Sequence, residues 1–357
     1  MAATEPILVL NVGSSTVKAA VFRGGERVHS WVGQAGNDPA ARLATLLDTI
    51  GQPVAAVGHR VVHGGMAFTR PTRITPEVLS ALDTLSPFAP LHLPPEVAAI
   101  RAVEKLLPGV PQVACFDTAF HATRPELETR YGIPRTYHDA GVRKYGFHGL
   151  SYQYIASRLP DVSARAASGK TVVCHLGSGA SVCGMQSGKS VSTSMGFSPL
   201  DGLLMSTRCG RIDPGVLLYM MKHGGMTADH VERLLSRESG LLGVSGVSGD
   251  MGQLLRASSA EAVFAVELFC DMAAKEIAAA AVALGGLDAI VFTAGIGENC
   301  PPVRAGIARR LAWLGLQLDA TANDGNAHTL HATGSRIEAF MIPTDEERVI
   351  AEAVVAV

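Results

Sequence analysis

The chain has 357 residues, of which 47% are hydrophobic and 38 are glycine, a length that predicts two domains or one large α/β unit. This apolar content excludes a disordered chain and a coiled coil. Thirty Lys and Arg against 32 Asp and Glu leave a net charge of −2, which argues against nucleic acid as an obligatory partner because binding it needs a dense basic surface.

The N-terminal sequence and the cysteines predict a cytoplasmic protein. Residues 1–12 carry no basic segment before their apolar stretch, so no signal peptide is expected. The longest apolar segment, from Ile277, is interrupted by two glycines and an aspartate, so no membrane span is expected. The six cysteines form no C-x-x-C pair, and Cys115, Cys174 and Cys270 lie in apolar runs that predict reduced core thiols.

Short β-branched runs alternate with longer helical patterns, which is typical of an α/β protein. In the first half, strands are expected at residues 7–13, 18–24, 28–33 and 55–62, and helices at 39–50, 76–85 and 94–107. A second, similar plan is expected to begin near residues 113–120. Its strands are expected at 171–185, at 288–299 (ending in a glycine-rich turn) and at 336–343, and its helices at 213–224, near 231, at 260–285 and at 346–356.

The strand–turn–strand pattern at residues 7–24 is echoed at 171–185, which suggests two duplicated lobes that share a cleft. Three glycine- and hydroxyl-rich turns follow apolar strands, in NVGSSTVK, HLGSGAS and TAGIGEN. Glycine lets the backbone approach a ligand, and exposed N–H and hydroxyl groups bind phosphate oxygens. Each turn alone is explained by a tight hairpin, but the three together favour a nucleotide site, with Lys18 either a phosphate contact or a solvated charge.

Two further patterns do not predict a site. SGKT at residues 168–171 resembles the end of a phosphate-binding loop, but that motif needs glycine where Ala164 stands. His59 and His63 are four residues apart, as in a zinc-binding helix, yet their segment GHRVVHGG is strand-like, so they cannot share a helical face.

Several charged residues allow both a functional and a structural interpretation. Arg60 and Arg208 lie beside small residues, where arginine is more often a surface charge, and His148 and His175 fit satisfied core histidines.

Three carboxylates follow apolar strands. Asp117 ends such a strand, a position where carboxylates serve a ligand or metal in open α/β sheets. Glu298 and Glu346 also follow strands, although a carboxylate at a helix N-terminus explains either of them.

Eleven ordered blocks of the chain, found nearly from end to end, resemble the acetate and propionate kinase family of the actin-like ATPase superfamily. They are VLNVGSSTVK, GHRVVHGG, APLHLPPE, FDTAFH, YGFHGLS, HLGSGASV, TSMGFSPLDGL, TRCGRIDPG, SGLLGVSG, FTAGIGEN and PTDEE. The resemblance implies two ribonuclease-H-like lobes flanking a nucleotide cleft. The first lobe would cover residues 1–116 and be completed by 347–357, and the second, with nucleotide binding and dimerisation, would cover 117–346.

The resemblance further implies phosphoryl transfer from ATP to acetate, giving acetyl phosphate and ADP, in a homodimer that needs Mg²⁺, or Mn²⁺ in its place. A carboxylate substrate is already ionised at neutral pH, so this chemistry needs charge stabilisation and not a general base.

Site residues carry over position by position. The metal pair would be Asn11 and Glu346, with Asp117 near the metal's water shell. The catalytic group at the phosphoryl would be Arg60, Asp117, His148 and Arg208. The acyl site would combine Arg60 with Val62, Leu91, Phe147 and Pro199. The nucleotide side would comprise Ser14, Thr16, Lys18, His175, Gly177, Ser178, Gly179, Asp250, Gly295, Gly297, Glu298 and Asn299.

Departures from the family pattern gather outside the phosphoryl-transfer group. The interval between Lys18 and GHRVVHGG is short, and Ser178 stands where the family usually has Asn. Gly252 stands where the family often has an Arg against the adenine, which predicts weak discrimination among purine nucleotides unless Arg256 compensates. The alternative functions are a propionate-preferring kinase of the same family and a catalytically silent ATP-binding regulatory protein.

Overall fold

The computed structural model describes residues 5–12, 16–34, 39–51 and 53–357. Packing divides the chain into two compact units. Unit 1 comprises Met1–Ala122, Phe147–Tyr154 and Asp345–Val357, and unit 2 comprises Thr123–Gly146 and Ile155–Thr344. These bounds differ from the expected lobes, which assigned residues 117–122, 147–154 and 345–346 to the second lobe.

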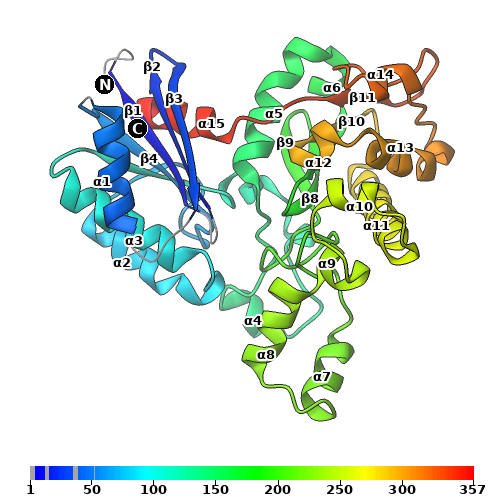
Figure 1. Ribbon diagram of the computed structural model, residues 1–357, viewed down its shortest axis with the longest axis horizontal. Coiled ribbons are helices and arrows are strands. Elements are labelled where there is room, and N and C mark those ends of the chain that lie inside the picture. The colour runs from blue at the N-terminus through cyan, green and yellow to red at the C-terminus, as the bar shows by residue number, and fades with distance from the viewer. Residues whose placement is uncertain (1–4, 13–15, 35–38, 52) are drawn as a thin grey trace. The chain divides into compact units, whose positions relative to one another are not determined.

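In the described part of unit 1, six strands form one sheet in the order β3-β2-β1-β4-β6-β5 (Figure 1). Strands β1 to β3 are an antiparallel meander, and β4 and β6 are parallel to β1. The strands are β1 (Ile7–Val12), β2 (Thr16–Arg23), β3 (Glu26–Gln34), β4 (Ala56–Val61), β5 (Thr72–Arg73) and β6 (Gln112–Phe116). The helices are α1 (Pro39–Ile50), α2 (Pro76–Thr84), α3 (Leu93–Leu106) and α15 (Glu346–Ala356).

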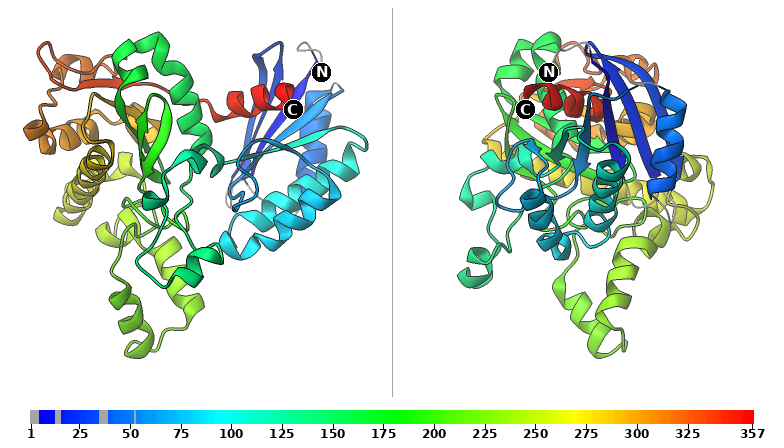
Figure 2. Two further views of the ribbon diagram at one scale, coloured as in Figure 1. Left: turned by 180° about the vertical axis from the view of Figure 1, so that it is seen from behind. Right: turned by 90° about the vertical axis from the view of Figure 1, so that its left-hand side faces the viewer.

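The two faces of this sheet form two cores because successive strand residues point to opposite sides. Leu8 and Leu10 of β1 pack with residues of α1 and α3 on one face. Ile7 and Val9 pack with α15 on the other face, so the red C-terminal helix lies against the blue N-terminal strands (Figure 2). Packing of α15 therefore explains why the chain terminus belongs to unit 1.

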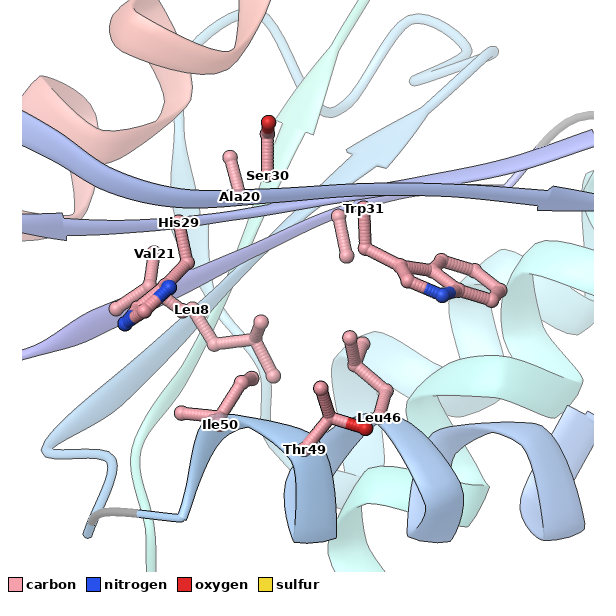
Figure 3. A pocket seen from close by; sticks show the side chains of 10 residues that line it. Leu8, Ala20, Val21, His29, Ser30, Trp31, Leu46, Thr49 and Ile50 are labelled. Carbon is pink, nitrogen blue, oxygen red and sulfur yellow. The ribbon is translucent and has the colours of Figure 1, made fainter.

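The α1 face is incompletely filled, and a hollow of about 70 Å³ remains under this helix. Leu46 and Ile50 of α1 face Leu8 and Val21 of the sheet across this hollow, with Trp31 at one end (Figure 3). The described part of the short interval between Lys18 and β4 thus contributes α1 to the cover of this face, together with α3.

In unit 2, five strands form a sheet in the order β11-β10-β7-β8-β9. Strands β7 to β9 are an antiparallel meander, and β10 and β11 are parallel to β7. The strands are β7 (Lys170–Leu176), β8 (Ala180–Gln186), β9 (Lys189–Thr193), β10 (Ala289–Thr293) and β11 (Glu338–Met341). The same order of pairing in both sheets confirms the duplicated lobes. The second plan begins at β7 and not near residue 113, because β6 pairs with β4 in the first sheet.

The longest helix of the described residues, α11 (Ala260–Leu284), packs along β7, β8 and β9 (Figure 1). Ser259 caps its first turn by accepting a hydrogen bond from the N–H of Ala262, and Gly285 ends it with a φ of 66°. Helix α5 (Gly149–Val162) begins in unit 1 and continues into unit 2. The other helices of unit 2 are α4 (Arg135–Asp139), α6 (Ala164–Ser168), α7 (Pro214–Lys222), α8 (Ala228–Arg233), α9 (Gly240–Ser245), α10 (Met251–Arg256), α12 (Ala294–Asn299), α13 (Pro301–Arg310) and α14 (Ala320–Asp324).

The structure also describes the cysteines and the lengths of the helices. All six cysteines, which lie within the described residues, are free, and Cys115, Cys174 and Cys270 are buried as expected of core thiols. Among the described residues, no helix combines the length and the apolar character that crossing a membrane requires.

Candidate active site

Three parallel strands of unit 1 place polar side chains at one edge of the sheet. Asn11 lies near the carboxyl end of β1, Arg60 near that of β4, and Asp117 directly after β6. In open α/β sheets, ligands bind at the carboxyl ends of the strands. The structure therefore brings together three of the residues assigned to the phosphoryl and metal sites.

Arg60 is the centre of this group and is not a surface charge. Its Nε and Nη2 donate to the two carboxylate oxygens of Asp117 at 3.0 and 2.5 Å, and its Nη1 donates to Oδ1 of Asn11 at 3.1 Å. The Asp117 side chain is 1% exposed and that of Arg60 16%. A bidentate pair fixes the guanidinium plane. These three bonds use three of the five N–H donors of the guanidinium, so two N–H groups are left for a second anion.

Glu346, the first residue of α15, is electrostatically part of the same group. Burial alone would lower the pKa of Arg60, but the negative charges of Asp117 and Glu346 outweigh it and raise that pKa. Burial raises the pKa of Glu346 to about 7, with repulsion from Asp117 adding to it, while Arg60 and Lys18 act in the opposite direction. Lys18 is directly opposite Asn11 in the β1–β2 pair, so its cation adjoins this group.

His148 stands directly before α5 with a φ of 58°, a conformation rare for a bulky residue. The following N–H, of Gly149, donates to the carbonyl of Asp117 at 2.9 Å. A Cβ at Gly149 would lie 2.1 Å from that carbonyl oxygen, so only glycine fits. The close approach holds His148 beside the Asp117 segment and ties residues 147–154 to unit 1.

The apolar residues assigned to the acyl site differ in position. Val62 and Phe147 are buried in unit 1, and Leu91 is half-buried. The ring of His63 contacts that of Phe147 edge-on, with 5.6 Å between centroids. Pro199 is buried in unit 2. His63 is thus a buried aromatic neighbour, in keeping with the rejected zinc motif.

The predicted phosphate turn lies only partly within the described residues. Ser14 lies outside the described residues, as does the side chain of Thr16. The backbone of Thr16 begins β2, and Lys18 is exposed on the same strand.

In unit 2, the predicted turn after β7 is present. His175 is buried near the end of β7, and the N–H of Gly177 donates to the carbonyl of Gly179 at 3.1 Å, closing a tight turn. Ser178 is exposed at its tip, and its carbonyl accepts from the N–H of Ser206 at 3.1 Å. Both hydrogen bonds therefore fix the backbone of the turn, while Ser178 at its tip remains exposed.

Arg208 is held through its backbone. Its carbonyl accepts from the N–H of Met205, and the next N–H, of Cys209, donates to the carbonyl of Leu235. Gly240, at a φ of 66°, packs so closely that a Cβ would lie 2.3 Å from the Met205 carbonyl oxygen. The Arg208 side chain is half-buried, and its Nη1 donates to the Pro199 carbonyl at 3.4 Å. The backbone contacts therefore fix the segment that carries this guanidinium.

The expected glycine-rich turn in TAGIGEN is a short helix, α12. Its first residue, Ala294, has a φ of 65°, and its N–H donates to Oε1 of Glu298 at 2.8 Å. The same oxygen accepts from the N–H of Thr344 at 3.1 Å. Glu298 thus satisfies backbone donors that would otherwise be free, which is why the segment coils into a helix.

A fully buried arginine fixes the other end of α12. Nη1 of Arg304 donates to the carbonyls of Gly297 and Glu298 at 2.8 and 3.0 Å, and its other donors bond to Asn323 and Asn326. All five acceptors are neutral oxygens. Arg304 therefore acts as a cation at a helix C-terminus.

The remaining nucleotide-side residues make local hydrogen bonds. Oδ1 of Asp250 caps α10 by accepting from the N–H of Gln253 at 2.8 Å. Nδ2 of Asn299 donates to the carbonyl of Gly295 at 3.0 Å. Both side chains are exposed. They can therefore contact a ligand while they keep these hydrogen bonds.

The donor set of unit 1 suits Mg²⁺. Asn11 and Glu346 offer one amide and one carboxylate oxygen, and Mg²⁺ is usually bound by one or two carboxylates together with waters and substrate phosphates. Among the described residues, no group of three or more His, Cys, Asp or Glu is arranged to hold a metal ion.

Glu96 and Arg304 have roles that were not predicted from the sequence. Glu96 is 2% exposed, and its Oε2 accepts from the N–H of Val62 at 2.9 Å. The signal was available, because Glu96 lies on the same helical stripe as Ile100 and Val103. No comparable pattern marked Arg304.

Comparisons with known proteins agree with this geometry. The sequence profile of the Acetokinase family matches residues 34–352. The acetate kinase of Rhodopseudomonas palustris is 46% identical over 98% of this chain and 98% of its own length. That of Methylocella silvestris is 50% identical over 85% of this chain and 75% of its own length.

Solved structures of two kinases are also similar to this chain. The crystal structure of Porphyromonas gingivalis acetate kinase matches with a TM-score of 0.89 and 32% identity, covering 99% of both chains. A propionate kinase from Francisella tularensis matches with a TM-score of 0.91 and 35% identity, covering 98% of both.

Two α/β units with the same strand order define a kinase of the actin-like ATPase fold. Within that fold the chain belongs to the acetokinase family, as the eleven sequence blocks predicted.

Proposed function

We propose that this enzyme transfers the γ-phosphoryl group of ATP to acetate, giving acetyl phosphate and ADP in a reversible reaction. The observation that carries the proposal is the nearly buried Arg60, fixed by Asp117 and Asn11 at the carboxyl ends of the parallel strands. A fixed guanidinium at that position suits a carboxylate substrate and a phosphoryl group, both of which are anions.

The residues of unit 1 position and neutralise charge. Arg60 binds the substrate carboxylate and stabilises charge on the transferred phosphoryl, with His148 beside it. Val62, Leu91 and Phe147 surround the methyl group. Asn11 and Glu346 would hold Mg²⁺, which would neutralise phosphate charge, and Asp117 keeps Arg60 in place.

The residues of unit 2 serve the nucleotide and the phosphoryl. Arg208 stabilises the charge in transfer, while the turn at Gly177–Gly179 and helix α12 bind the nucleotide, with His175 and Asp250 as further contacts. The exposed tip of that turn and the fixed ends of α12 support this assignment.

The test is an assay with ATP, Mg²⁺ and acetate in which hydroxylamine traps acyl phosphate as the hydroxamate. We expect hydroxamate and ADP in equal amounts. Parallel reactions with propionate and butyrate test the propionate-preferring alternative, since one methylene changes pocket affinity by about 1–3 kcal/mol. ATP binding without hydroxamate from any short carboxylate would favour the regulatory alternative.

We also propose a cytoplasmic homodimer formed through unit 2. Helix α7 has no buried residue in the described structure, although most of its side chains are apolar. Four of them are well exposed, namely Val216, Leu218, Tyr219 and Met221. Apolar surface of this kind marks an interaction site. Light scattering should give twice the chain mass, and Leu218→Glu with Tyr219→Glu should give the monomer.

A further inference from the structure

We propose that Glu96 is a positioning residue that stays uncharged while substrate is bound, so that Arg60 keeps its attraction for the carboxylate. The proposal rests on the proposed function of Arg60 and concerns a residue to which the sequence assigned no role. Its basis is the position of Glu96 in α3, its hydrogen bond to the end of β4, and its charged neighbours.

Glu96 anchors the chain where β4 leaves the sheet. Oε2 of Glu96 accepts the Val62 N–H at 2.9 Å, and the carbonyl of Val61 accepts the Asp117 N–H at 3.0 Å. Both bonds are made by the peptide group between Val61 and Val62, which lies just after Arg60. The position of Val62, and of the backbone directly after Arg60, therefore depends on α3.

The second carboxyl oxygen of Glu96, Oε1, is buried and has no hydrogen-bond partner among the described residues. A buried ionised carboxylate with one unpaired oxygen is unfavourable, whereas a protonated carboxyl lowers that cost. Burial raises the pKa of Glu96 to about 8, with a smaller contribution from Asp117, although Arg60 and the Val62 N–H act in the opposite direction.

Two charged groups act on Glu96, namely Arg60 from β4 and Asp117 from the end of β6. Helices α1 and α2 also pack against α3, but their acidic residues, Asp48, Glu77 and Asp83, are exposed. Arg60 and Asp117 already neutralise each other. An ionised Glu96 would therefore leave a net negative charge beside the arginine that has to bind an anion.

A bound anion makes ionisation of Glu96 less favourable. By linkage, ionisation of Glu96 weakens binding of the anion by the same free energy. If bound acetate raises the pKa of Glu96 by one unit, ionisation of Glu96 weakens acetate binding tenfold. The KM for acetate should accordingly rise about tenfold between pH 7 and pH 9.5.

The first experiment compares the wild type with Glu96→Gln, which is neutral at every pH and can still accept the Val62 N–H. We expect the rise in KM above pH 8 in the wild type and its absence in Glu96→Gln. Glu104→Gln, at an exposed position of the same helix, should keep the wild-type profile. A purely structural Glu96 would give the same pH profile in all three proteins and overturn the proposal. A flat wild-type profile would do so even if Glu96→Gln failed to fold.

The second experiment does not depend on activity. Between pH 4.5 and 8 the folded protein keeps the Glu96 proton that the unfolded chain loses, so stability falls as pH rises through this window. The difference in Tm between Glu96→Gln and the wild type should therefore grow from pH 5 to pH 8 and then level off. A constant difference would overturn the proposal. Growth of the difference without hydroxamate formation would instead reject the proposed reaction and leave the protonated Glu96 established.

Discussion

The two units share one strand order but use the ends of their strands differently. In unit 1, the carboxyl ends of β1, β4 and β6 carry a charged group centred on Arg60, whose partners include a buried carboxylate. In unit 2, β7 and β10 end in glycine-rich segments, and the buried Arg304 bonds only to neutral oxygens. The scaffold thus fixes where a site lies, and the side chains at the strand ends decide its chemistry.

This difference in charge predicts different consequences when Arg60 is removed from unit 1 and when Arg208 is removed from unit 2. In unit 1, removal of Arg60 exposes negative charges to one another. In unit 2, hydrogen bonds of the backbone hold the segment around Arg208, so loss of its side chain should destabilise the fold less than loss of Arg60.

The largest effect is expected for Arg60→Met. It leaves Asp117, which is 1% exposed, without its counter-charge, and breaking a buried pair in this way costs about 3–5 kcal/mol. We expect a lower denaturation midpoint and no measurable hydroxamate. Arg101→Met, which removes an exposed arginine paired with Asp83, is the control and should change neither. Full stability of Arg60→Met would show that Asp117 does not depend on this partner.

Arg208→Ala should affect catalysis more than stability. Loss of one preorganised charge donor lowers kcat by roughly 10²–10³, and the free energy of unfolding should fall by less than in Arg60→Met, because backbone hydrogen bonds hold the segment around Arg208. Steady-state kinetics and urea unfolding measure the two. Arg233→Ala, at an exposed position of the same unit, serves as the control. Early unfolding with normal turnover would assign Arg208 to structure.

Nucleotide selectivity should depend on Arg256. A Cβ at Gly252 would lie 3.5 Å from Nη1 of Arg256, so this guanidinium already covers the position where the family often has an arginine. The geometry favours compensation by Arg256 over loss of selectivity. We expect the wild type to prefer ATP and Arg256→Ala to lose up to about 2 kcal/mol of that preference. The ratio of kcat/KM for ATP to that for GTP measures it, and equal ratios in both proteins would exclude Arg256.

The sequence was sufficient for the repeated sheets because β-branched runs and glycine turns recur in the same order. It also placed Asp117 after an apolar strand, where the structure has it. It could not distinguish Arg60 from a surface charge, since its partner lies 57 residues away. The helix at TAGIGEN was missed for a different reason. Most of the bonds that hold it are local, since Glu298 accepts the Ala294 N–H and Arg304 donates to the Gly297 and Glu298 carbonyls, and a glycine-rich composition does not reveal such bonds.

The smallest effect is expected at Ala294 in unit 2 and concerns backbone strain. Its φ of 65° costs an alanine about 1–2 kcal/mol, whereas glycine adopts it freely but loses about 0.5–1 kcal/mol of backbone entropy. Ala294→Gly should therefore raise the free energy of unfolding by up to about 1 kcal/mol.

The same change should weaken nucleotide binding, because the added backbone freedom lies at the start of α12. Ser187→Gly relieves a similar φ, of 51°, in the turn between β8 and β9, and it should leave the KM for ATP unchanged. Urea unfolding and the KM for ATP, measured on both variants, separate strain relief from its consequence for binding. A lower stability of Ala294→Gly would mean that the left-handed alanine is relaxed, and an unchanged KM would mean that α12 does not contact the nucleotide through its first turn.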